Sequence, residues 1–208
     1  MNLPNLLTLS RIPLMLAVIG LLYPWSDTTW PWIRTSALLL FLFAALTDWL
    51  DGWLARKFGQ VSEFGKFMDA LSDKVLTLGM FVSLLALKHL DVLDSWALFP
   101  VLLILSREFL ITGLRLVAAG KGETLAAEKI GKLKTIIQLT CISLYLGKIA
   151  LEADFKQFFA GQEKLHSLLV DVLEYSGHIS LLAATVITVF SGIVYLSKYW
   201  KFFLDEDS

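Results

Sequence analysis

The chain has 208 residues, a net charge of −1 and a mean hydropathy of +0.67, and only 18% of its residues are charged. This low fraction of charged residues argues against a soluble protein, because about a quarter of the residues in soluble domains are usually charged. A near-neutral chain creates no basic field for nucleic acid, and its single cysteine cannot form an internal disulfide. Length and composition therefore predict one membrane domain covering residues 1–208.

Six apolar segments are each long enough to cross a bilayer, which takes roughly 20 mainly apolar residues. We expect spans at about 5–23, 34–56, 64–88, 95–119, 130–150 and 179–200. They predict an all-α polytopic membrane protein with six transmembrane helices. Residues 151–178 are too polar to span, and the apolar positions between Phe155 and Leu173 recur at helical spacing. We expect an inserted helix here that lies on the outer membrane surface.

The basic residues predict how the chain is oriented in the membrane. With both termini in the cytoplasm, twelve Lys and Arg residues lie at the inner ends of the spans and five on the outer side. This excess matches the positive-inside rule. We therefore expect a multi-pass protein of the inner (cytoplasmic) membrane with cytoplasmic termini. The three histidines, His89, His166 and His178, fall in the outer regions, where we expect polar surface residues.

Four aspartates interrupt the second and third apolar segments, where charged residues are rare and usually functional. Asp48 and Asp51 are three residues apart, and Asp69 and Asp73 are four apart, so each pair shares one helix face. Asp51 and Asp69 are each nine residues from Gln60, where the chain is expected to turn. The four carboxylates should therefore lie in two facing layers, about 13–20 Å of helix from that turn.

Clustered carboxylates in a low dielectric cannot all stay ionised unless a cation neutralises them. A donor set made only of oxygen favours Mg²⁺ or Mn²⁺ over zinc. The carboxylates alone also allow a polar clamp between helices or a carboxylate-lined cation transporter.

The aspartates belong to a longer motif. The string Asp48-Trp-Leu-Asp51-Gly52-Trp-Leu-Ala55-Arg56 is followed by Gly65, Asp69 and Asp73. It closely resembles the signature DxxDGxxAR…G…D…D of the CDP-alcohol phosphotransferase family. The segments 2–11, 107–115 and 131–135 are similar to family members that use glycerol 3-phosphate, whereas 151–178 resembles nothing known in the family.

The resemblance implies six helices around a cytoplasm-facing polar cavity, usually in a homodimer. It implies transfer of a phosphatidyl group from the membrane lipid CDP-diacylglycerol to an alcohol. It also implies a centre of Mg²⁺ or Mn²⁺, commonly two ions, held at the positions Asp48, Asp51, Asp69 and Asp73. The last of these, Asp73, would be the catalytic base. The residues implied for CDP are Gly52, Ala55, Arg56, Asn5 and Thr8.

The choice of acceptor depends on a basic cluster, which comprises Arg107, Arg115, Lys132 and Lys134. Cations facing a metal site favour an acceptor that carries its own phosphate, and glycerol 3-phosphate fits. The alternatives are lysines that snorkel to the interface, a local pair between Arg107 and a helix carboxylate, or a sibling enzyme that uses inositol phosphate, serine or phosphatidylglycerol. A cation transporter would leave the Gly52–Ala55–Arg56 string unexplained, and a membrane scaffold gives no reason for charges within spans.

Overall fold

The computed structural model describes residues 3–23, 31–58, 63–90, 96–120 and 129–199. Side chains are described at 10–23, 31–47, 72, 74–90, 96–118, 131 and 133–199. Within this part of the chain all regular secondary structure is helical, which confirms the all-α prediction. The helices are α1 (Leu3–Leu22), α2 (Ile33–Phe58), α3 (Glu63–Ala86), α4 (Leu98–Gly120), α5 (Lys129–Ala153), the short 3₁₀ helix η2 (Lys156–Phe159) and α6 (Glu163–Tyr199).

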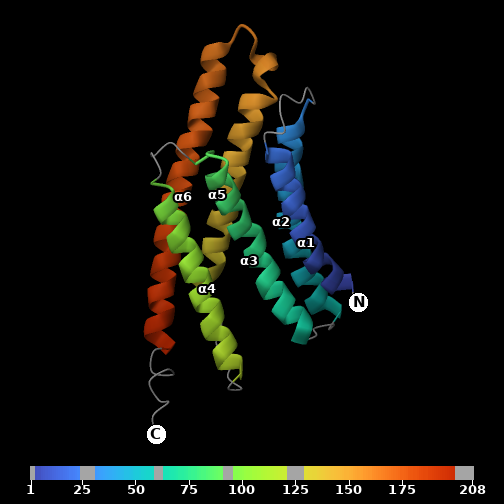
Figure 1. The fold of residues 1–208 in the computed structure, drawn as a ribbon, viewed down its shortest axis with the longest axis vertical. Helices are drawn as coiled ribbons and strands as arrows, with labels where there is room; N and C mark the ends of the chain where they lie inside the picture. Colours follow the sequence, from blue (N-terminus) through green and yellow to red (C-terminus); the bar gives the residue numbers. More distant parts are fainter. Residues whose placement is uncertain (1–2, 24–30, 59–62, 91–95, 121–128, 200–208) are drawn as a thin grey trace.

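The helices form a bundle in which α1 packs against α2 and α3, α5 against α2 and α6, and α4 against α6. The start of α1, the facing ends of α2 and α3, and the ends of α4 and α6 lie at one end of the bundle (Figure 1). At the other end, α5 and α6 form a hairpin that extends beyond the other helices (Figure 1). Large buried side chains such as Phe41, Phe81 and Tyr145 fill the interior.

The outer surface of the bundle is rich in apolar side chains. The more exposed of these, distributed over α2, α4 and α6, include Leu39, Phe43, Phe99, Phe109, Ile179, Val186, Phe190 and Ile193. So much exposed apolar surface is exceptional for a protein in water and is what lipid contact requires. Among the described residues, Leu133–Ala153 and Glu163–Tyr199 are long and apolar enough to cross a membrane, and shorter apolar stretches occupy 10–22, 33–47 and 74–86.

The segment 151–178 differs from its prediction, because it forms no separate helix. The chain leaves α5 at Ala153 and reverses through η2 and Gly161, whose φ of 87° suits a residue without a side chain. It then enters α6, which runs unbroken for 37 residues into the last predicted span. The cause lies in contacts with α5: Lys148 pairs with Glu174 at 3.1 Å, and Gly177 lies against the Tyr145 ring.

The surface prediction is also wrong for His178, which is only 9% exposed and contacts Tyr145 edge-on at 5.7 Å between ring centroids.

The hairpin is attached to the start of α2 by one carboxylate and three aromatic rings. Asp154 Oδ2 accepts hydrogen bonds from the backbone N–H of Thr35 at 2.6 Å and from its hydroxyl at 2.7 Å. This carboxylate therefore satisfies a donor that the first turn of a helix leaves free. The Trp32 ring lies 5.1 Å from Phe155 and 5.5 Å from Phe158, measured between centroids.

Candidate functional site

The helix bounds place the four aspartates at two matched levels. Asp51 lies seven residues before the end of α2, and Asp69 lies six residues after the start of α3. Asp48 and Asp73 are each ten residues from the same two helix ends. At 1.5 Å per residue, the levels are about 10 and 15 Å from those ends. All four side chains lie outside the described residues, so the metal cluster stays a prediction.

Among the side chains that are described, no group of three or more His, Cys, Asp or Glu could hold a metal ion.

The residues predicted to bind CDP share the same end of the bundle. Gly52, Ala55 and Arg56 lie in the last turns of α2, and Asn5 and Thr8 lie in the first turns of α1, which packs against α2. The side chains of these five positions are outside the described part. The next turn of α1 carries Arg11, which is fully buried. A buried guanidinium is rare unless it is paired, and Arg11 is not without a partner.

The structure brings two residues of the predicted basic cluster together on one carboxylate. Glu108 of α4, only 3% exposed, accepts hydrogen bonds from Lys134 Nζ of α5 and from Arg107 Nη1 at 3.2 Å. The other terminal nitrogen, Arg107 Nη2, donates to Ser191 Oγ of α6 at 2.8 Å. This charge network, defined by Arg107, Glu108, Lys134 and Ser191, therefore joins three helices.

A glycine makes room for the arginine in this network. A Cβ atom at position 192 would lie 2.9 Å from Arg107 Cγ, which is closer than real Cβ atoms approach other atoms. Gly192 thus lets the arginine stem lie across α6 and reach Ser191. Any larger residue would displace the stem.

The charge network offers a buried hydrogen-bond donor. In it, Arg107 and Lys134 share the Glu108 carboxylate. The Nε of Arg107 is buried and has no hydrogen-bond partner among the described residues. A buried donor without an acceptor is costly, and charges interact strongly where water is scarce. A ligand with an acceptor oxygen would satisfy this donor.

The two other cations of the predicted cluster are placed differently. Arg115 lies two turns beyond Arg107 on α4, where its Nε donates to Tyr195 Oη at 3.2 Å. Its guanidinium carbon is 5.3 Å from the centre of the same ring. Lys132 lies in the first turn of α5, and its side chain is outside the described residues. Of the predicted basic cluster, Arg107 and Lys134 thus share one carboxylate, whereas Arg115 packs against Tyr195.

Sequence reasoning missed Glu108 and Ser191. A signal existed for Glu108, because it is a second charged residue inside an apolar segment, directly after Arg107. That position matches the alternative in which Arg107 pairs with a helix carboxylate, and the 3.2 Å contact shows such a pair. For Ser191 no signal existed, because small polar residues are common in membrane helices.

Comparison with known proteins gives a consistent result. A family model described as CDP-alcohol phosphatidyltransferase matches residues 1–190. A Bacillus subtilis (strain 168) protein is 36% identical over 209 residues, covering 96% of each chain. An Escherichia coli (strain K12) protein is 32% identical over 210 residues, covering 99% of this chain and 98% of its own. A Rickettsia bellii (strain RML369-C) protein is 32% identical over 202 residues, covering 97% of each. All three are named CDP-diacylglycerol–glycerol-3-phosphate 3-phosphatidyltransferase.

Proposed function

We propose, from the premise that this chain belongs to the CDP-alcohol phosphatidyltransferase family, that it transfers a phosphatidyl group from CDP-diacylglycerol to sn-glycerol 3-phosphate. The products are phosphatidylglycerophosphate and CMP, so the enzyme makes a phospholipid within the membrane. The observation that carries this function is the nearly full-length similarity to relatives that are named for the same reaction.

The reaction needs a base and a way to neutralise charge. The acceptor hydroxyl oxygen forms a bond to the lipid-side phosphorus, the bond from that phosphorus to the CMP oxygen breaks, and the hydroxyl proton goes to Asp73. The oxygen-only donor set of Asp48, Asp51, Asp69 and Asp73, at two matched levels, would hold Mg²⁺ or Mn²⁺, and the family motif implies two ions. When bound, such ions would neutralise the charge of the donor's diphosphate.

The charge network gives the acceptor phosphate a place to bind. Arg107 and Lys134 contact the phosphate, while Glu108 holds both cations at one level between α4 and α5. The free Nε of Arg107 donates to a phosphate oxygen. Arg115 and Lys132, nearer the helix ends, complete the basic surface through which the acceptor enters.

The donor nucleotide binds where α1 and α2 pack together. Gly52 and Ala55 leave the α2 surface open to the nucleotide because they lack large side chains. Arg56, Asn5 and Thr8 contribute polar groups. This assignment is supported by the match to the family motif and by the shared end of the bundle (Figure 1).

The proposed arrangement in the membrane is the one that the sequence predicts. We place six spans around a polar cavity that opens to the cytoplasm of the inner membrane, with both termini cytoplasmic and two copies forming a homodimer. The distribution of basic residues and the apolar outer surface support this placement.

An acceptor screen tests the function. Purified protein in detergent receives CDP-diacylglycerol, Mg²⁺ and one alcohol at a time, and CMP release is measured. We expect turnover with glycerol 3-phosphate and its loss after chelation. Turnover with inositol phosphate, serine or phosphatidylglycerol, but none with glycerol 3-phosphate, would replace this acceptor. Ion flux through vesicles without CMP release would favour the transporter instead.

A further inference from the structure

A buried hydrogen bond joins α5 to α6 next to the charge network. Gln138 of α5 is only 2% exposed and donates from Nε2 to Thr188 Oγ1 of α6 at 3.3 Å. Gln138 lies four residues after Lys134, on the same face of α5. Thr188 lies three residues before Ser191, on the same face of α6. Because a buried amide is costly unless it is hydrogen-bonded, this bond opposes sliding of α6 along α5.

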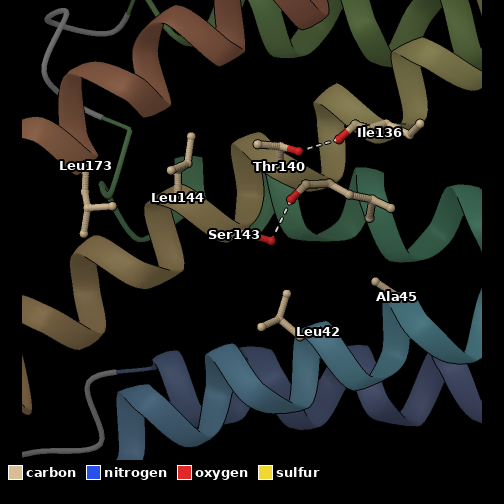
Figure 2. A pocket seen from close by; sticks show the side chains of 8 residues that line it. Leu42, Ala45, Ile136, Thr140, Ser143, Leu144 and Leu173 are labelled. Carbon is tan, nitrogen blue, oxygen red and sulfur yellow. Dashed lines mark hydrogen bonds between the residues drawn. The ribbon is translucent and has the colours of Figure 1, made fainter.

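Other hydroxyl groups of the two helices form hydrogen bonds within their own helix. Thr140 and Ser143 of α5 donate to the backbone carbonyls four residues before them, at 2.9 and 2.8 Å (Figure 2). Thr185 of α6 donates to the carbonyl four residues before it at 2.8 Å. Bonds of this kind do not depend on the neighbouring helix. The Thr188 hydroxyl instead accepts from Gln138, so it connects two helices.

Thr188 is also connected to Arg107, through Ser191. The Ser191 hydroxyl donates to the Thr188 carbonyl at 3.0 Å and accepts from Arg107 Nη2 at 2.8 Å. A hydroxyl has a single proton, and here that proton is used within α6. The oxygen of Ser191 is therefore left to accept from the guanidinium, and the position of α6 at residues 188–191 fixes where Arg107 lies.

Two cations must reach the same phosphate in the proposed function. Lys134 is carried by α5. Arg107 is carried by α4, but its Nη2 is held by Ser191 of α6. The distance between the two cations therefore depends on how α5 and α6 lie against each other at this level. Charge-assisted hydrogen bonds keep donor and acceptor about 2.7–2.9 Å apart, so a small shift between these helices weakens a contact with the shared anion.

We propose that Gln138 is a positioning residue for acceptor binding, which acts through Thr188 and Ser191 rather than by contact with the substrate. Its bond to Thr188 fixes α6 against α5 and so sets the separation of Arg107 and Lys134. This inference rests on the proposed function and adds to it a residue pair that determines how tightly the acceptor phosphate is held. Binding of the donor nucleotide, assigned above to α1 and α2, should not depend on this bond.

The test removes the bond from each side. Thr188→Val keeps the size of the side chain and removes the acceptor oxygen, whereas Thr188→Ser keeps the oxygen. Gln138→Leu removes the amide. The matched controls are Thr185→Val and Thr140→Val, each of which removes a hydroxyl that bonds within its own helix. CMP release is measured with glycerol 3-phosphate and CDP-diacylglycerol varied in turn, and the apparent Tm of each variant is recorded.

We expect Thr188→Val and Gln138→Leu each to raise the KM for glycerol 3-phosphate about three- to tenfold. The kcat and the KM for CDP-diacylglycerol should stay within about twofold of the values for the unmodified protein. The double variant should show no larger effect than either single variant, because both changes remove the same bond. Thr188→Ser and the two controls should keep a normal KM for glycerol 3-phosphate.

An unchanged KM for glycerol 3-phosphate in both bond-deficient variants would overturn the inference. Equal changes in kcat and in both KM values, together with a lower Tm, would also overturn it, since they indicate a general packing defect. Effects that add in the double variant would overturn it as well, because the two residues would then act separately. If the unmodified protein releases no CMP with glycerol 3-phosphate, the proposed function is rejected, and the inference with it.

Discussion

Two ionic contacts between helices differ in whether all of their hydrogen-bond donors have an acceptor. Near one end of the bundle, Glu108 is shared by Arg107 and Lys134. In the hairpin, Lys148 pairs with Glu174 alone, at 3.1 Å. Both contacts are largely shielded from solvent, yet only the first includes a buried nitrogen, Arg107 Nε, without an acceptor among the described residues. Burial alone therefore does not mark a binding site, whereas a buried donor without an acceptor calls for a further partner.

The largest difference is expected when one carboxylate in each half of the molecule is replaced by an amide. Asp73→Asn should abolish CMP release, because it removes the base and part of the metal site. Asp154→Asn should keep the reaction, because Asp154 only caps α2 and can still accept one hydrogen bond. Both variants are compared by membrane insertion, binding of CDP-lipid and initial rate. Near-normal rates in Asp73→Asn would assign the base to another residue.

The second comparison removes one charge from each ionic contact. Lys134→Ala should raise the KM for glycerol 3-phosphate about ten- to a hundredfold, since a lost charge-assisted contact to the acceptor phosphate costs about 1.5–3 kcal/mol. The KM for the CDP-lipid should change much less. Glu174→Gln should leave both values near normal and act on thermal stability only. Equal effects of the two variants on the acceptor KM would remove the functional distinction between the contacts.

A third comparison uses two glycines of α6. Gly192→Ala places a Cβ against the stem of Arg107, and an off-rotamer side chain costs about 0.5–1.5 kcal/mol. The acceptor KM should therefore rise roughly two- to tenfold. Gly177→Ala meets the Tyr145 ring at 3.1 Å and should lower the apparent Tm with little change in KM. A normal KM for the acceptor in Gly192→Ala would show that Arg107 takes no part in acceptor binding.

The smallest expected effect is a pH dependence at the hairpin end. Burial lowers the pKa of His89 below its ordinary value of 6.5; Arg34 and Lys148 lower it further, and Glu152 opposes them. The unfolded chain therefore binds this proton more readily. The contribution of neutral His89 to the stability of the folded state is therefore complete above about pH 6.5. It is lost as the pH falls toward the pKa of His89 in the folded state. His89→Gln should reduce the difference in apparent Tm between about pH 7.5 and 5.5.

If His89→Gln leaves that difference unchanged, another group controls the acid sensitivity. The acceptor KM at neutral pH serves as the control and should be unaffected.

The sequence predicted the helices well because apolar length is a strong local signal. The bounds of α1 to α5 agree with the expected spans within a few residues. It failed at 151–178, since local polarity does not reveal that Lys148 and Gly177 bind the start of α6 to α5. The motif located the four aspartates, whereas the partnership of Glu108 with Lys134 depends on how α4 and α5 meet. That contact between helices is a tertiary property, which periodicity within one segment cannot specify.

The continuous α6 has a mechanical consequence. Its 37 residues form a rod about 55 Å long, well beyond a hydrocarbon core of roughly 30 Å. Helices that exceed the bilayer thickness respond by tilting or by deforming the surrounding lipid. Ser191, which holds Arg107, and Glu174, which holds Lys148, sit on this one rod. A change in bilayer thickness that tilts α6 would therefore shift both contacts together.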